Sequence, residues 1–236
     1  MTKVLVSDQI DQAGIDILSQ VAQVDQRLGL SLNELKDIIG DYEALMIRSG
    51  TQVTEEVIEV AEKLRIIGRA GVGVDNVDVS AATKRGVLVV NSPGGNTIAA
   101  AEHALALLLS LSRHIPQAHA SMCSGSWDRK KFVGNELYKK KLGVVGLGKI
   151  GSHVAKVANA LGMEVIAYDP FVSAERAQQM QVVLSSIEDV FKAADFITLH
   201  LPRTSETENL VNTKILSTMK NSARIINCAR GGIIDE

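Results

Sequence analysis

The sequence has few cysteines, few prolines, almost no net charge and no long uninterrupted hydrophobic run. Its two cysteines, Cys123 and Cys228, lack the spacing of a metal site or a disulfide framework, so we expect no bound metal and reduced thiols in a cytoplasmic protein. Only four prolines beside 46% hydrophobic residues indicate a globular chain that buries a large core. The longest apolar stretch, residues 98–111, is interrupted by polar side chains and is too short to span a bilayer.

The charge balance excludes two classes of partner. A net charge of −2 and a pI near 6.2 argue against nucleic acid or an anionic membrane. The basic clusters at residues 129–131 and 139–141 are short and predict solvated surface. Residues 1–3 lead directly into a short apolar run, which does not resemble a signal peptide. We therefore expect neither a nucleic acid nor a membrane as partner.

Short apolar runs alternate with amphipathic segments, the pattern of parallel sheets covered by helices. The expected strands are residues 3–7, 21–25, 44–48, 65–70, 87–91, 142–145, 164–168, 196–200 and 223–228. Helices are expected at residues 31–39 and at residues 54–61, where Thr54 and the two glutamates after it suit a helix start. The sequence thus predicts an α/β fold.

A cluster of turn-forming residues at 92–96 separates two sets of strands, which predicts domains at residues 1–96 and 97–236. A helix rich in Ala and Leu is expected from residue 97 to about residue 121. Apolar residues occur on nearly all sides of this helix, so we expect it to be buried between domains or against another subunit.

The segment from Gly146 to Gly151 fits the pattern G-x-G-x-x-G, with Gly148 as its second glycine. It follows an expected strand and opens a helix that begins at Lys149 and Ile150, as dinucleotide binding requires. The first glycine makes a tight turn, the second lets the backbone approach the pyrophosphate, and the third lets the helix pack on the strand. The N–H groups at the helix N-terminus then face the phosphates.

Asp169 ends the next expected strand, about 20 residues beyond the glycines, where a ribose-binding acid is expected. Its carboxylate can accept both ribose hydroxyls and would repel a 2′-phosphate. No arginine follows it immediately. The sequence therefore predicts NAD as cofactor and disfavours NADP.

Longer segments carry a family resemblance. Residues 69–78 (RAGVGVDNVD) resemble the substrate loop of the D-2-hydroxyacid dehydrogenases, and residues 227–232 (NCARGG) resemble the segment with that family's catalytic arginine. Residues 46–49, 91–97 and 127–137 resemble the branch of the family that acts on D-3-phosphoglycerate. The resemblance covers essentially the whole chain.

The resemblance implies two α/β domains with the substrate between them. Residues 1–96 would form a flavodoxin-like substrate-binding lid, and residues 97–236 a Rossmann domain that binds NAD and makes a homo-oligomer, typically a dimer. The implied reaction is NAD-dependent oxidation of 3-phosphoglycerate, the first step of serine biosynthesis. Two alternatives remain open: a dehydrogenase of another D-2-hydroxy acid, such as glycerate or lactate, or an NAD(H)-sensing protein similar to the C-terminal-binding-protein corepressors.

The resemblance also implies roles for residues. Arg230 would be catalytic, because its planar fork can hold the substrate carboxylate and the developing carbonyl. The backbone N–H groups of Val72 and Gly73 would hold the other carboxylate oxygen, although the family often has threonine where Val72 stands. Arg48 would contact the substrate phosphate, and Ser49 would be a further substrate-binding residue. Further implied contacts are Leu201, Cys228, Ala229 and Arg230 itself for the cofactor, and Arg129 or Lys130, from a partner subunit, for the phosphate.

The family's general base is a histidine oriented by a glutamate, both downstream of the arginine segment. No histidine follows Arg230 here, and we do not expect Glu236 to be the orienting acid. His200, at an expected strand end, is the one candidate substitute, whereas His103, His114 and His119 are placed in the long helix. We therefore expect a C-terminally truncated chain. Its lid would lack a returning helix, its Rossmann domain would lack the last strands, and the 236 residues alone would not turn over phosphoglycerate.

Overall fold

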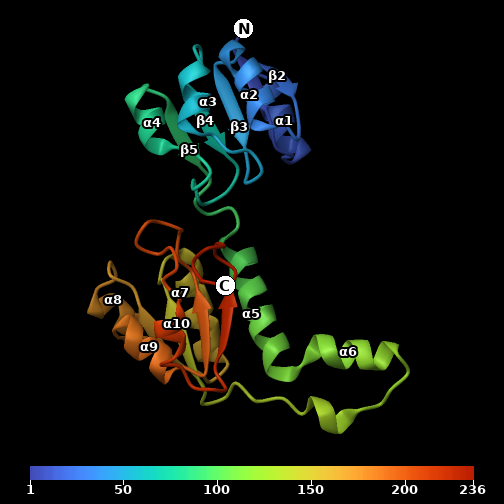
Figure 1. The fold of residues 1–236 in the computed structure, drawn as a ribbon, viewed down its shortest axis with the longest axis vertical. Helices are drawn as coiled ribbons and strands as arrows, with labels where there is room; N and C mark the ends of the chain where they lie inside the picture. The colour runs from blue at the N-terminus through green and yellow to red at the C-terminus, as the bar shows by residue number, and fades with distance from the viewer. The chain divides into compact units, whose positions relative to one another are not determined.

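The computed structural model describes residues 1–236, which form two compact units, Met1–Asn96 and Thr97–Glu236. Each unit contains one five-stranded parallel sheet with helices packed on it (Figure 1). The predicted α/β fold class is confirmed. None of the helices has both the length and the apolar character that a membrane crossing requires.

The first unit has the strand order of flavodoxin-like folds. Its strands are β1 (Lys3–Val6), β2 (Gln23–Gln26), β3 (Ala44–Ile47), β4 (Ile66–Arg69) and β5 (Leu88–Asn91). They are arranged β2-β1-β3-β4-β5, and every neighbouring pair is parallel. The carboxyl ends of all five strands therefore share one edge, where the loops that follow them meet.

Helices cover both faces of this first sheet. They are α1 (Gln12–Ser19), α2 (Leu32–Ile38), the 3-10 helix η1 (Ile39–Asp41), α3 (Glu55–Val60) and α4 (Val79–Lys84). Val4 and Val6 of β1 share a buried cluster with α1, whereas Leu5 shares the opposite one with α2, α3 and α4. On β5, Leu88 and Val90 remain 65% and 46% exposed.

Two helix starts in this unit differ in how they are capped. Ser31 and Glu34 form a complete capping box at α2. Thr54 occupies the N-cap position of α3, as expected from the sequence, but its side chain makes no capping hydrogen bond and its hydroxyl is buried without a partner. The stabilisation of α3 therefore comes from Glu55 and Glu56 in its first turn and from burial of Val57 and Ile58.

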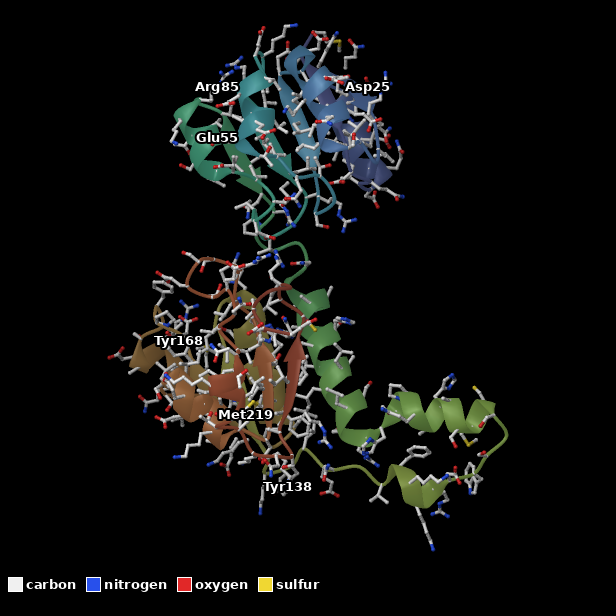
Figure 2. All side chains as sticks on the ribbon, in the orientation of Figure 1. Asp25, Glu55, Arg85, Tyr138, Tyr168 and Met219 are labelled. Carbon is white, nitrogen blue, oxygen red and sulfur yellow. The ribbon has the colours of Figure 1, made fainter.

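The second unit has the order of the first five strands of a Rossmann sheet. Its strands are β6 (Lys141–Val145), β7 (Glu164–Tyr168), β8 (Val183–Leu184), β9 (Phe196–Leu199) and β10 (Arg224–Asn227). The arrangement is β10-β9-β6-β7-β8, all parallel. In Figure 2, Tyr168 marks the carboxyl end of β7, and Tyr138 and Met219 lie toward the opposite edge. The order reverses between β6 and β9, where such sheets bind ligands.

Helices also cover both faces of the second sheet. They are α5 (Thr97–Arg113), α6 (Ile115–Cys123), the 3-10 helix η2 (Arg129–Phe132), α7 (Lys149–Ala160), α8 (Ala174–Gln179), α9 (Ile187–Ala193) and α10 (Thr213–Leu216). Residues of α5 and α7 share one core cluster with β6, including Leu108, Val154 and Val144. The other face is buried by α9 and α10 through Phe191 and Ile215. These buried contacts fix the position of α7 relative to β6, the strand that precedes it in the chain.

The single long helix expected from residue 97 to about residue 121 is wrong. The chain breaks at His114, which has a left-handed backbone (φ 53°), and a new helix begins at Ile115 with Pro116 in its first turn. Proline has no N–H and clashes with the preceding turn, so a helix cannot continue through it without distortion. His114 is therefore not a helical residue, and Figure 1 shows α6 leaving the second sheet at the end of α5.

The expected burial of this segment holds for only one face of α5. Ala101, Ala104 and Leu108 are buried, whereas Leu107 and Leu109 are exposed in this chain. Helix α6 contains no buried residue. Its large apolar side chains Ile115 and Met122 are 50% and 53% exposed.

Candidate functional site

The glycines of the G-x-G-x-x-G segment are required by close packing. Gly146 has φ 95°, and a Cβ there would lie 2.7 Å from the carbonyl oxygen of His200. A Cβ on Gly151 would overlap the carbonyl oxygen of Gly146. At Gly148, by contrast, a Cβ would meet nothing within 4 Å. The first glycine therefore lets the loop pack against the backbone of His200, and the third lets the helix pack against the loop itself. The second leaves the loop open on one side, as approach of a dinucleotide requires.

The start of α7 is held by its own loop. Gly148 is the N-cap and has no side chain with which to satisfy the N–H groups of the first turn, which includes Lys149 and Ile150. Ser152 donates its hydroxyl to the carbonyl oxygen of Leu147 at 2.7 Å, which fixes the loop ahead of the helix. Sequence reasoning missed Ser152, although a hydroxyl right after the third glycine was a readable signal. The arrangement suits an anion at the helix N-terminus.

Asp169 is joined to the glycine loop. One carboxylate oxygen accepts the N–H of Leu147 at 2.7 Å, and the other accepts the N–H of Phe171 at 2.9 Å. The N–H of Gly146 donates to the carbonyl of Tyr168 at 2.8 Å, which ties the ends of β6 and β7 together. The structure thus brings the acid and the fingerprint together, as the sequence predicted. The carboxylate is held in place by backbone N–H groups and does not depend on an ion pair.

The segment after β10 forms a turn organised by Asn227. Its side-chain oxygen accepts the N–H of Ala229 at 3.0 Å, and its amide donates to the carbonyl of Arg230 at 2.8 Å. The Arg230 guanidinium donates to the Ala229 carbonyl at 2.7 Å. Burial raises the pKa of the Cys228 thiol, which keeps it protonated and less nucleophilic. Asn227 is a second functional candidate that was not selected from the sequence.

His200 follows β9 and lies beside the glycine loop. Its Nε2 is 3.0 Å from the hydroxyl of buried Thr198, and burial lowers its pKa to about 4. Its backbone N–H donates to Val145, and the side chain of Leu201 approaches the position that a Cβ on Gly146 would occupy. A mostly buried imidazole with so low a pKa is a weak base at neutral pH. The geometry therefore disfavours His200 as a general base.

The lowered pKa of His200 predicts acid sensitivity. An unfolded histidine titrates near 6.5, so its contribution to stability is complete above that pH and is lost as the pH falls toward 4. Between pH 7.5 and 5 we expect urea unfolding to show a loss of about 2 kcal/mol from this residue. His200→Gln should flatten the pH dependence, whereas His119→Gln, at an exposed position, should not. Equal pH slopes in wild type and His200→Gln would contradict this assignment.

The first unit places its predicted residues at the carboxyl edge of its own sheet. Arg48 and Ser49 are exposed in the loop after β3, and Val72 and Gly73 lie in the loop after β4. Asn91, at the end of β5, donates its side-chain amide to the carbonyl of Val72 at 2.5 Å. The loops after β3, β4 and β5 are thus adjacent, in the order that the sheet gives them.

Other predicted contacts lie elsewhere in the second unit. Arg129 and Lys130 are exposed on η2, next to an ion pair between Lys131 and Asp128 at 2.8 Å. Glu236 is exposed. Within this unit, Arg129 and Lys130 belong to the segment around α6 and not to the carboxyl edge of the sheet.

Comparison with known proteins agrees with this geometry. Residues 105–236 match the family described as D-isomer specific 2-hydroxyacid dehydrogenase, NAD binding domain. The whole chain is 63% identical to a D-3-phosphoglycerate dehydrogenase of Synechocystis and spans 43% of that protein's length. It is 51% identical over 237 residues to a D-3-phosphoglycerate dehydrogenase of Methanocaldococcus jannaschii and spans 45% of it.

A solved structure supports the fold of the whole chain. The D-lactate dehydrogenase of Aquifex aeolicus, complexed with NAD and lactic acid, matches with a TM-score of 0.90 at 27% identity. The match covers 99% of this chain and 71% of that one. Since the chain spans less than half the length of the two curated relatives, the complete proteins contain much more than the two units described above.

Proposed function

Because the chain belongs to the D-isomer specific 2-hydroxyacid dehydrogenase family, we propose that the protein carrying it oxidises D-3-phosphoglycerate to 3-phosphohydroxypyruvate with NAD, the first step of serine biosynthesis. The main support for this proposal is the sequence identity: 63% along all 236 residues to a D-3-phosphoglycerate dehydrogenase, compared with an identity of 27% to a D-lactate dehydrogenase. NADH formation from D-3-phosphoglycerate tests the proposal. No NADH formation, together with NAD binding, would instead favour the alternative of an NAD(H)-sensing protein.

The second unit fits an NAD molecule. The open side of Gly148, the uncapped start of α7 and the Asp169 carboxylate would meet the pyrophosphate and the adenosine ribose. Lys149, Ile150 and Leu201, with the segment Cys228–Arg230, complete the proposed contact set. NAD supplies the hydride acceptor of the reaction. The residues of this chain bind and orient it.

Asp169 tests the cofactor proposal. In Asp169→Ala the two ribose hydroxyls lose a charged acceptor, and we expect NAD affinity to fall by roughly 100-fold in calorimetry. Asp195→Ala is the matched control, because Asp195 also accepts a backbone N–H, from Lys141 at 2.9 Å, but lies at the opposite edge of the sheet. Unchanged NAD affinity in Asp169→Ala would remove this residue from the site. Replacing Asp169 with Asn and adding a nearby arginine should relax the selection against NADP.

For the substrate, the proposed roles divide between the units. Arg230 would hold the carboxylate and the oxygen at C2 through its planar fork. The N–H groups of Val72 and Gly73 would bind the remaining carboxylate oxygen, and Arg48, with Ser49, would contact the phosphate. The carbonyl of Val72 is already engaged by Asn91, so the peptide plane there is fixed.

The proton of the substrate hydroxyl needs a base outside these residues. His200 is disfavoured by its contact with Thr198 and its low pKa, and no histidine follows Arg230 within the 236 residues. Since the chain spans less than half the length of the two curated relatives, we propose that the base lies in a part of such a protein that these 236 residues do not include, and that the 236 residues alone do not turn over phosphoglycerate. A rate from the 236-residue polypeptide comparable to that of the natural-length protein would refute this.

We also propose that the second unit forms a homo-oligomer through α5 and α6. The supporting observation is the exposure of large apolar side chains: Leu109 of α5 is 40% exposed, Ile115 and Met122 of α6 are 50% and 53% exposed, and Trp127 in the loop after α6 is 72% exposed. Large apolar side chains that stay exposed, when they gather on one face, mark interaction sites in proteins. Sedimentation equilibrium measures the outcome, and a monomer at micromolar concentration would contradict it.

A further inference from the structure

Four of the six buried polar or charged side chains lie together in the first unit. Ser7, Thr51, Arg69 and Asn76 are 1%, 7%, 9% and 6% exposed. They come from the ends of β1 and β4 and from the loops after β3 and β4. Burying polar groups is unfavourable unless they are hydrogen-bonded, so a cluster of this size needs specific partners. The side-chain amide of Asn76 donates to two carbonyl groups of the loop 48–51, the Ser7 hydroxyl pairs with that of Thr51 in this loop, and Arg69 donates to Asn76.

The N–H groups of this loop are held from one side by Asp8. One carboxylate oxygen of Asp8 accepts the N–H of Arg48 at 2.6 Å and the N–H of Thr51 at 3.0 Å. Ser7, next to Asp8, places its hydroxyl 2.8 Å from the hydroxyl of Thr51. Hydrogen bonds to an ionised acceptor are about twice as strong as neutral ones, so Asp8 fixes both ends of the loop.

The carbonyl groups of the same two residues are held by Asn76. Its side-chain amide donates to the carbonyl of Arg48 at 2.7 Å and to that of Thr51 at 2.6 Å. Its side-chain oxygen accepts Nε of Arg69 at 3.0 Å, and its backbone carbonyl accepts the N–H of Val53 at 2.8 Å. The loop after β3 is thereby bound to the loop after β4, in which Asn76 lies.

These contacts join two parts of the proposed substrate site. Arg48 lies in the loop after β3, and Val72 and Gly73 lie four and three residues before Asn76. With the N–H and C=O of Arg48 both held, its backbone cannot turn without breaking bonds to two other elements. The two loops must therefore move together or not at all.

We propose that Asp8 and Asn76 are positioning residues that set the geometry of Arg48 relative to the Val72–Gly73 backbone. This geometry serves the binding of a D-2-hydroxy acid with a distal phosphate. We call the pair the Asp8–Asn76 clamp. The inference rests on the proposed function, because it assigns the clamp to the same substrate. Neither residue needs to touch the substrate. Misplacement of a binding group by about 1 Å is enough to cost 10-fold or more.

The test uses Asp8→Asn and Asn76→Asp in the natural-length protein. Asp8→Asn removes the charge from the acceptor, and Asn76→Asp places a carboxylate against two carbonyl oxygens while Arg69 keeps a partner. Each should raise KM for D-3-phosphoglycerate at least about 10-fold, with kcat and NADH affinity within about two-fold of wild type. Asp41→Asn is the control. Asp41 precedes β3 and pairs with Lys63, which precedes β4, so the pair lies at the other edge of the sheet. This variant should leave KM, kcat and NADH affinity unchanged.

Amide hydrogen exchange gives a readout that does not depend on turnover. In Asp8→Asn the amides of Arg48 and Thr51 should exchange about 10-fold faster, whereas those of β1 and β3 stay protected. An unchanged KM in both variants would overturn the clamp, as would equal losses in KM and NADH affinity, which would indicate general damage. If wild type oxidises a different D-2-hydroxy acid, the proposed substrate fails, and KM for that acid then tests the clamp separately.

Discussion

Arg230→Lys should lower kcat for D-3-phosphoglycerate oxidation by roughly 100-fold or more. The guanidinium presents two parallel N–H donors to a carboxylate or carbonyl, and an ammonium cannot reproduce that fork. Arg230 lies in a turn fixed by Asn227, so its loss should not reorganise the sheet. Steady-state kinetics of the natural-length protein measure kcat. NADH titration measures the cofactor affinity, which should stay within about two-fold of wild type.

Arg224→Lys is the matched control for this result. Arg224 is the first residue of β10, and its guanidinium lies 5.4 Å from the ring centroid of Phe196, at the opposite end of the strand from Arg230. Its replacement by lysine should leave kcat close to wild type. Turnover near wild type in Arg230→Lys would mean that the carboxylate is held elsewhere and that the assignment is wrong.

The second large effect is expected at the glycines of the dinucleotide loop. Gly151→Ala places a methyl group onto the carbonyl of Gly146, so the loop must open; we expect NAD binding to be lost and the Tm to fall by roughly 5 °C. Gly148→Ala places its methyl group in open space, so the Tm should stay within about 1 °C. Because that space faces the proposed pyrophosphate, NAD affinity should still fall, by about 10-fold.

Comparing the two alanine variants separates folding from binding. Calorimetry for NAD and thermal unfolding without NAD are sufficient. If Gly148→Ala binds NAD as tightly as wild type, the dinucleotide does not approach this side of the loop. If Gly151→Ala keeps both its Tm and its affinity, the close packing against Gly146 is not what holds the loop.

The strands and the dinucleotide loop were predictable because their signals are local. Parallel strands buried on both faces are apolar runs, and the strand Glu164–Tyr168 was predicted with its observed bounds. One helix and one strand, each with a fixed rise per residue, separate the glycines from Asp169. The number of residues between them therefore predicts how they lie in space. The two-residue strand β8 gives no such periodic signal and was missed.

Other features were not predictable because they depend on tertiary contacts. The helix break at His114 uses a left-handed backbone that non-glycine residues seldom adopt, and an apolar pattern continues through it. Asp8 and Asn76 are 68 positions apart by number and meet only because β1, β3 and β4 are neighbours in the sheet. The contact of His200 with Thr198 depends on burial that the residue types alone do not indicate.

Substrate choice by the natural-length protein tests the central claim most directly. The measurement is kcat/KM for NAD reduction with D-3-phosphoglycerate, D-glycerate and D-lactate under identical conditions. We expect D-3-phosphoglycerate to be preferred by at least about 100-fold, because only it offers a phosphate to Arg48 beside the carboxylate that Arg230 and the Val72–Gly73 backbone hold. A preference for D-lactate or D-glycerate, or no NAD reduction with any of the three, would contradict the claim.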